Sequence, residues 1–210
     1  MFTIVNVSSP LPDDRTARAR IRDEALALFA DRGSDAVTMR DIAAAAGVSP
    51  ALLIRHYGSK DGLIEAVDNH VVAVFETLLT DMTAQTAAVG LNASAVPSML
   101  DGFATHLPPD SAIPAYLGRL LIAGGSVGAA LFARLYRISR TALDAMVAAG
   151  LASPGDADVR AAWLLVNDLA VLTLRARVSE VLGVDPLSNT GIKRWASEVF
   201  AIYRDGLKSS

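Results

Sequence analysis

The chain contains no cysteine among its 210 residues. Disulfide bonds and thiolate metal sites are therefore excluded. Histidine is scarce as well, and His56, His70 and His106 are too far apart in the sequence to indicate a metal cluster. Because no cofactor motif is present either, the sequence predicts neither a cofactor nor a bound metal.

The sequence also lacks a long apolar run, although 52% of its residues are hydrophobic. Its longest uncharged apolar stretch, Leu120 to Ala133, has 14 residues and contains three glycines, whereas a membrane-spanning helix needs about 20 residues. The N-terminus, MFTIVNVSSPLPDD, has neither the basic start nor the apolar core of a signal peptide. We therefore expect a cytoplasmic protein that has no membrane partner and buries much apolar surface.

Strand patterns are nearly absent, and the apolar residues recur at helical spacing between prolines and glycines. The sequence therefore predicts an all-α protein. After the N-terminal region, the predicted helices cover Lys60 to about Met82, Ala93 to Leu107, Ser111 to Ala123, Ser126 to Ala149, Asp156 to Leu182, and Asn189 to Leu207.

One segment, TMRDIAAAAGVSPALLIRHYGSK, has the pattern of two short helices joined by a turn. Thr38 is a typical N-cap residue, and Asp41 follows three positions later, as in a capping box. The first helix is predicted to run from Met39 to Ala46. Gly47 then stands where a helix commonly ends in a left-handed residue, and Val48 can fill the space between the two helices.

The second helix of this segment has equally local signals. Ser49 can cap it, and Pro50 occupies its first position, where the missing amide costs nothing. The helix is predicted to end near Tyr57, before Gly58, and Ser59 can cap the helix that follows. Two short helices around a glycine-centred turn indicate a helix-turn-helix motif, which points to DNA binding.

From about Arg15 to Ala66, the sequence resembles the DNA-binding domain of the TetR (tetracycline-repressor) family of bacterial transcriptional regulators. The stretch DRGSDAVTMRDIAAAAGVS matches the family pattern. A supporting helix, Arg18 to Arg32, has an apolar face made of Ile21, Ala25, Leu28 and Phe29. The resemblance implies a flexible arm (residues 1–14), a three-helix helix-turn-helix domain (15–60), and a helical effector-binding and dimerisation domain (61–210).

The resemblance also implies roles for individual residues. It assigns phosphate contacts to three of them and a place facing the major groove or its walls to six more, with Leu53 and Tyr57 in the core. The phosphate-contacting residues are Thr38, Arg40 and Lys60, and the groove-facing residues are Ser49, Ala51, Leu52, Ile54, Arg55 and His56.

Base recognition would depend mainly on Arg55 and His56, since an arginine can bond guanine through two hydrogen bonds. Ala51, Leu52 and Ile54 can make only apolar contacts, such as those to a thymine methyl group. The family usually has tyrosine at the position of Ile54 and commonly glycine at that of Ala51. The missing tyrosine removes one expected phosphate contact.

The charge distribution agrees with DNA binding at one end of the chain. Residues 15–60 contain eight Lys and Arg against five Asp and Glu, a net charge of +3, whereas residues 61–210 contain 11 against 15, a net of −4. With −2 from residues 1–14, the total is −3. A basic N-terminal domain followed by an acidic remainder confines the attraction for phosphate to one end of the chain. Scattered arginines, however, also occur on solvated helix faces that bind no nucleic acid.

The last two predicted helices are candidates for a homodimer interface. The stretch Trp163 to Leu174 is apolar nearly all round, so it must be covered on more than one side. An intrachain core is the alternative, because periodicity does not separate the two. The predicted interface residues are Leu165, Leu169, Leu172, Ile192, Trp195, Val199 and Ile202.

The resemblance places an effector pocket among the middle helices, which hold a few polar or aromatic residues in apolar surroundings. Asn167 and Asp168 are of interest because burying them mid-helix is costly unless a group such as Arg175 bonds them. For each residue the alternative is an ordinary core or helix-end role. The candidates for binding a small, largely apolar effector are His106, Tyr116, Arg119, Trp163, Asn167 and Asp168.

The predicted function is a transcriptional regulator, by family resemblance a repressor, that binds a near-palindromic operator as a homodimer and is released by the effector. The helix after Ser59 would transmit the change. One alternative is a helical ligand-binding protein with a degenerate DNA-reading domain. Another is an esterase, since residues 124–128 match the G-x-S-x-G motif around Ser126, but no histidine follows His106 as that mechanism requires. We therefore expect no enzyme activity.

Overall fold

A computed structural model describes residues 14–89, 96–108, 110–122, 125–150, 152 and 154–207. In this part of the chain all regular structure is helical, as the sequence predicts. The predicted arm, residues 1–14, lies outside the described residues except for Asp14, which begins the first helix. The helices are α1 (Asp14–Arg32), α2 (Met39–Ala45), α3 (Pro50–Tyr57), α4 (Lys60–Val89), α5 (Val96–His106), α6 (Ile113–Ile122), α7 (Ser126–Ala148), α8 (Ala157–Thr173), α9 (Arg175–Leu182) and α10 (Asn189–Leu207).

The chain divides into two compact units, Met1–Asp68 and Asn69–Ser210. The division falls inside α4, eight residues beyond the predicted domain boundary at residue 60. Helix α4 itself continues to Val89, past the predicted end near Met82. It is longer because the residues that follow Met82 in the helix, TAQTAAV, include neither glycine nor proline.

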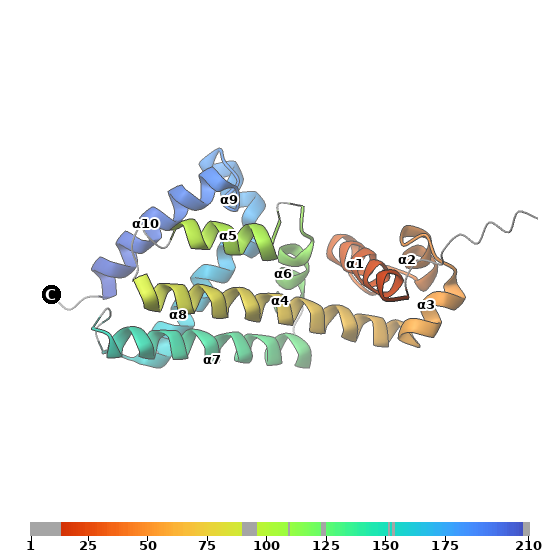
Figure 1. The fold of residues 1–210 in the computed structure, drawn as a ribbon, viewed down its shortest axis with the longest axis horizontal. Helices are drawn as coiled ribbons and strands as arrows, with labels where there is room; N and C mark the ends of the chain where they lie inside the picture. The colour runs from red at the N-terminus through yellow and green to blue at the C-terminus, as the bar shows by residue number, and fades with distance from the viewer. Residues whose placement is uncertain are drawn as a thin grey trace, which may run out of the picture. The chain divides into compact units, whose positions relative to one another are not determined.

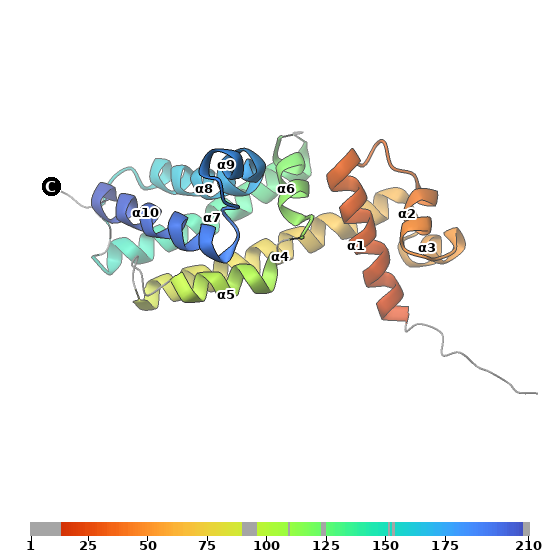
Figure 2. The same ribbon diagram turned by 90° about the horizontal axis from the view of Figure 1, so that it is seen from above.

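In the first unit, α1 packs against both α2 and α3, which lie on the same side of it (Figure 2). The predicted apolar face of α1 is confirmed, since Ile21, Ala25 and Phe29 are fully buried and Leu28 is half-buried. The other helices each contribute to this core. Their fully buried residues are Ile42 of α2, Leu53 of α3, and Leu63 and Val67 of α4.

In the second unit, α7 packs along α8, α6 packs against both, and α10 packs against α5. Helices α5 and α7 flank α4 (Figure 1). His106 of α5 lies 3.3 Å from Asp81 of α4, from imidazole Nε2 to carboxylate Oδ2, and Arg134 of α7 forms an ion pair with Glu76 of α4.

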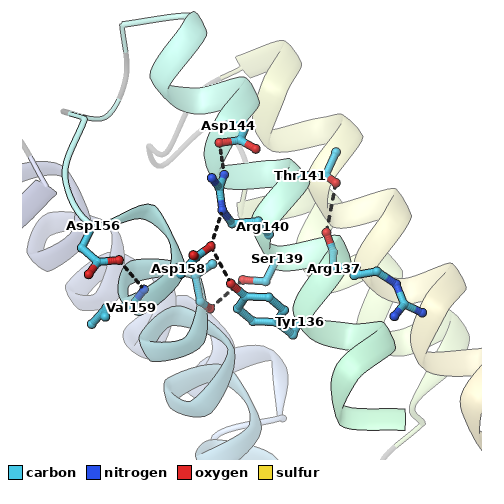
Figure 3. Close-up of polar contacts among 10 residues, drawn as sticks. Tyr136, Arg137, Ser139, Arg140, Thr141, Asp144, Asp156, Asp158 and Val159 are labelled. Carbon is cyan, nitrogen blue, oxygen red and sulfur yellow. Dashed lines mark hydrogen bonds and ion pairs between the residues drawn. The ribbon is translucent and has the colours of Figure 1, made fainter. Parts of the chain in front are cut away.

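Polar contacts join α7 to α8 (Figure 3). The hydroxyl of Tyr136 and the Nε of Arg140 both donate to Oδ1 of Asp158, at 2.9 and 3.1 Å. The hydroxyl of Ser139 donates to the carbonyl of Ala161 at 3.0 Å. The bond from Tyr136, followed by that from Arg140, holds the pKa of Asp158 below its ordinary value.

The prediction of one continuous helix from Asp156 to Leu182 is wrong, because the helix is interrupted at Leu174 between α8 and α9. The hydroxyl of Thr173 donates to the carbonyls of Leu169 and Ala170, at 3.0 and 3.4 Å, and such back-bonding commonly bends helices. After the break, Arg175 forms two hydrogen bonds with Asp185, at 2.9 and 2.5 Å. The predicted bounds of α10 are confirmed.

Candidate DNA-binding site

The capping box predicted at the start of α2 is present. The amide of Thr38 donates to Oδ2 of Asp41 at 2.8 Å, and the amide of Asp41 donates to the Thr38 hydroxyl at 3.2 Å. The Thr38 hydroxyl also donates to the same carboxylate at 2.6 Å. These bonds hold the pKa of Asp41 below its ordinary value. The start of α2 is therefore fixed by two residues three positions apart.

The turn between α2 and α3 is built on Gly47. Helix α2 ends at Ala45 with Ala46 as its C-cap, one residue earlier than predicted. Gly47 has φ +62°, the left-handed conformation that the sequence predicts. A Cβ atom at Gly47 would meet no other atom within 4 Å. Glycine is thus favoured there by the backbone conformation and not by crowding.

The predicted caps of α3 and α4 are also confirmed. The hydroxyl of Ser49 accepts the amide of Leu52 at 3.2 Å, and Pro50 is the first residue of α3. The helix ends at Tyr57, and Gly58 follows with φ +74°. The hydroxyl of Ser59 accepts the amide of Gly62 at 3.1 Å at the start of α4.

Three contacts that the sequence does not predict tie this motif to α1. The Nε of Arg20 donates to the carbonyl of Ala46 at 2.8 Å, which satisfies the C-terminal end of α2. The hydroxyl of Tyr57 donates to the carbonyl of Arg18 at 2.7 Å, and the Arg18 guanidinium lies 5.4 Å from the centroid of the Tyr57 ring. Tyr57 is half-buried, so it bridges the core and the surface, and burial raises the pKa of its hydroxyl.

Helix α3 has one buried face and one exposed face. Leu53 is fully buried, as the sequence predicts. Ala51, Ile54 and Arg55 are exposed and, three and four positions apart, share one side of the helix. All nine predicted DNA-binding residues have solvent-accessible surface. Thr38, Arg40, Ser49, Ala51, Ile54 and Arg55 are exposed, and Leu52, His56 and Lys60 are half-buried.

The candidate effector residues of the second unit have varied surroundings. Tyr116 is buried and His106 is half-buried beside Asp81. Asn167 is half-buried, whereas Arg119, Trp163 and Asp168 are exposed. The premise that α8 buries a carboxylate is therefore wrong for Asp168, because this residue lies on the solvated side of the helix.

Four of the predicted dimer-interface residues are buried within the single chain, which agrees with the intrachain alternative: Leu165, Leu169, Leu172 and Ile192. Val199 packs against the buried cluster formed by Leu143, Met146, Ala152, Ala161 and Leu164. Trp195 is half-buried, and Ile202 is 58% exposed. On α8 the exposed apolar residues are instead Val159, Trp163 and Val166, which are spaced four and three positions apart.

The G-x-S-x-G sequence does not form a nucleophile elbow. That motif needs a strand before the serine, and none occurs in the described part of the chain. Gly125, with φ 101°, is the N-cap of α7, and Ser126 is its first helical residue. Over the same residues, no single helix has the length and apolarity to cross a membrane; α6 and α7 pass that test only as a pair bent by 110°.

The first unit thus presents a short helix with an exposed arginine, held by a glycine turn and supported by a third helix. This is the arrangement of a helix-turn-helix protein, whose second helix enters the major groove of DNA. Residues 21–67 match the family described as bacterial regulatory proteins, tetR family. The chain belongs to this family and is a transcriptional regulator.

A curated relative carries this assignment beyond the first unit. The HTH-type transcriptional regulatory protein RaaS of Mycobacterium tuberculosis is 34% identical over 155 residues, which cover 73% of this chain and 68% of that protein. The match therefore includes much of the second unit. The family is one of regulators, not enzymes.

Solved structures share the fold. A gamma-butyrolactone receptor (ArpA-like protein) has a TM-score of 0.62 at 21% identity, over 89% of this chain and 97% of that one. AibR, solved with isovaleryl coenzyme A and operator DNA, has a TM-score of 0.63 at 18% identity, also over 89% and 97%. At these identities the likeness extends to the helical fold of both units.

Proposed function

We propose that the protein binds a near-palindromic operator as a homodimer and represses transcription until a small effector releases it. The observation that carries this proposal is the exposed side of α3, where Arg55 lies beside Ile54 and Ala51 on a helix whose two ends are capped. A homodimer supplies two such helices, which two half-sites one helical turn apart require.

The DNA-contacting residues fall into two groups. Arg55 and His56 would bond base edges, and Arg55 suits guanine because its planar guanidinium can donate two parallel hydrogen bonds. Thr38, Arg40 and Lys60 would contact phosphates and set the register of the protein on the duplex. Ser49, Ala51, Leu52 and Ile54 would contact the groove and its walls.

The dimer interface that we propose uses the apolar residues left exposed on α8 and α10. Val159, Trp163 and Val166 form a stripe along α8, and Ile202 is exposed on α10. Burying these side chains in a two-fold interface would remove them from water. Leu165, Leu169 and Leu172 would support the interface from within each protomer.

The effector that we propose is a small, largely apolar molecule bound in the second unit. Candidate contacts remain Tyr116, His106 and Asn167, whose side chains are at least half-buried. AibR shows that a protein of this fold can hold a small molecule and operator DNA. Because α4 contains residues of both units, a ligand-dependent shift of its second-unit portion would move Lys60 and alter the spacing of the two α3 helices.

The test of DNA binding is the affinity of the purified full chain for its own upstream DNA at two salt concentrations. Arg55→Ala should weaken binding mainly to the specific site, by about 5- to 150-fold per half-site, as expected for the loss of one bidentate base contact in each. Lys60→Ala should weaken binding to all sequences and lower the salt dependence by about one phosphate contact per protomer. Arg177→Ala, which removes an exposed arginine of the second unit, is the matched control.

If neither the upstream DNA nor a random-sequence selection yields a specific site, the proposal fails. The degenerate-domain alternative would then hold. The sign of regulation is read from a reporter fused to the bound promoter, since deletion of the protein should raise expression from a repressed promoter and lower it from an activated one.

The homodimer is tested separately by sedimentation equilibrium. Val166→Asp, which places a charge in the proposed interface, should shift the mass from dimer to monomer. Val181→Asp is the control, since Val181 is 85% exposed on α9 and outside the stripe. Equal masses for Val166→Asp and the wild-type protein would exclude this interface.

A further inference from the structure

Ile54 is the one large hydrophobic residue that is exposed among the described residues of the first unit. It is 53% exposed, whereas Leu53 beside it is fully buried. The exposed part of this β-branched side chain gains nothing from the fold of its own unit. Ile54 lies between Ala51 and Arg55 on the exposed side of α3. The remaining use for its apolar surface is contact with a partner.

The chemistry of the side chain restricts what it can touch. Ile54 has no hydrogen-bonding atom, so it can bond neither a phosphate oxygen nor the polar edge of a base. Placing it against phosphate would remove water from the phosphate without any replacement bond. On base edges in the major groove, the apolar group is the C5-methyl of thymine.

The position of Ile54 on α3 is well defined. The Ser49 cap fixes the start of the helix, and the Tyr57 hydroxyl fixes its end against α1. Ala51, one turn before Ile54, is also exposed and apolar. Arg40, Arg55 and Lys60 carry the positive charges of the same motif. An apolar contact thus falls in the middle of the exposed side of α3, beside Arg55.

We infer that Ile54 reads a thymine in each operator half-site through its C5-methyl group, with Ala51 packed beside it. This inference rests on the proposed function and specifies its recognition chemistry. The chain then recognises its operator by one apolar and one bidentate polar contact on adjacent residues, Ile54 and Arg55. The discrimination against cytosine at that position depends on a methyl group and not on a hydrogen bond.

The experiment compares the specific site found by selection with versions in which each thymine is replaced in turn by deoxyuridine. This replacement removes the methyl group and keeps every hydrogen-bonding atom of the base. One symmetric pair of positions should weaken wild-type binding by about fourfold per half-site, or about fifteenfold for both, as expected for the burial of one methyl group each.

The variants locate the methyl contact. Ile54→Ala should bind the thymine operator more weakly and should no longer distinguish thymine from deoxyuridine at that pair. Ile122→Ala removes another exposed isoleucine, which is 80% exposed and belongs to the second unit, and should leave the discrimination unchanged. Because Ile54 is not part of the core, both variants should unfold at the wild-type temperature.

The inference is overturned if wild-type protein binds all deoxyuridine operators as tightly as the thymine operator, or if Ile54→Ala keeps the full discrimination. Either result leaves the proposed function standing, provided that Arg55→Ala still loses the specific site. Failure to select any specific site, by contrast, removes the proposed function and this inference together.

Discussion

The two units of the molecule hold their helix ends in different ways. In the first unit, Thr38, Ser49 and Ser59 each accept an amide from a residue three positions later. The second unit has local caps as well, at Asp156 and Ser188. Its long helices, however, are joined by contacts between residues far apart in the sequence, such as Tyr136 with Asp158 and Arg134 with Glu76.

This difference shows which parts of such a protein are specified locally. A cap depends on two residues within one turn, so the helix-turn-helix can form its ends wherever those residues occur. A contact between α7 and α8 exists only once both helices have packed. The first unit should therefore be sensitive to single residues in its turns, and the second to its packing and its ion pairs.

The largest expected effect tests whether the units unfold separately. Leu53→Ala in the first unit and Leu135→Ala in the second both remove a fully buried side chain, and each should cost about 2–5 kcal/mol of unfolding free energy. Both tryptophans, Trp163 and Trp195, belong to the second unit. Denaturant unfolding of Leu53→Ala should therefore shift the circular dichroism signal more than the tryptophan fluorescence.

Leu135→Ala provides the matched comparison, since it should shift the fluorescence transition directly. If Leu53→Ala shifts both signals by the same amount, the chain unfolds as one cooperative unit, and the distinction between the units applies to structure but not to stability.

The glycine turn gives the next effect. Gly47→Ala places a side chain at φ +62° and should destabilise the first unit by about 1–2 kcal/mol. Gly102→Ala in α5 should have the opposite sign, a gain of about 0.5–1 kcal/mol, because a Cβ there would lie at an ordinary 3.5 Å from Leu78. Thermal unfolding measures both. A neutral Gly47→Ala would contradict the requirement for a left-handed residue.

The capping box should contribute a smaller and pH-dependent effect. Thr38→Ala should cost about 1 kcal/mol at neutral pH, and Thr38→Ser should keep most of the cap. Because the pKa of Asp41 is lowered in the folded protein, the part of this contribution that comes from the Thr38 hydroxyl donating to the Asp41 carboxylate is fully present above the ordinary pKa of an aspartate, and it is lost as the pH falls through the lowered pKa. The difference between wild type and Thr38→Ala should therefore shrink in acid, and a constant difference would contradict this coupling.

The smallest effect concerns ion pairs of the second unit. Asp185→Asn should cost up to about 1 kcal/mol at neutral pH, since Arg175 and Asp185 are partly exposed. Arg175 holds the pKa of Asp185 below its ordinary value, so this stabilisation too is lost as the pH falls through the lowered pKa.

The control for that pair is Glu180→Gln, which breaks the exposed pair with Arg177 three positions away and should change stability by about 0.5 kcal/mol or less. A larger effect for Glu180→Gln than for Asp185→Asn would reverse the comparison between local and distant contacts in this unit. Urea unfolding at two pH values measures both variants.

The distinction between local caps and contacts that are distant in the sequence explains what could be predicted from the sequence. The caps at Thr38, Ser49 and Ser59 follow from residue types at fixed spacing, and the ends of α3 follow from Pro50 and Gly58. The bond from Arg20 to the Ala46 carbonyl could not be predicted, because every residue carries a carbonyl and the partner is 26 positions away. Only the packing of α1 against the turn selects the carbonyl of Ala46.

In the second unit, periodicity predicts helices but not which side of each is covered. Leu165 lies in the core and Trp163 on the surface, although both belong to one apolar stretch, because α6 and α7 cover only part of α8. Just before the break at Leu174, the hydroxyl of Thr173 has the choice of solvent or the carbonyl of Leu169. Sequence spacing does not decide that choice.

The connection between α2 and α3 also has a consequence for amide hydrogen exchange. Three successive amides in it are bonded: Ala46 to the Ile42 carbonyl at 2.9 Å, Gly47 to Ala44 at 3.2 Å, and Val48 to Ala43 at 2.9 Å. These amides should exchange with solvent as slowly as those of a helix interior. A connection already ordered in the free protein has little conformational entropy left to lose when DNA binds.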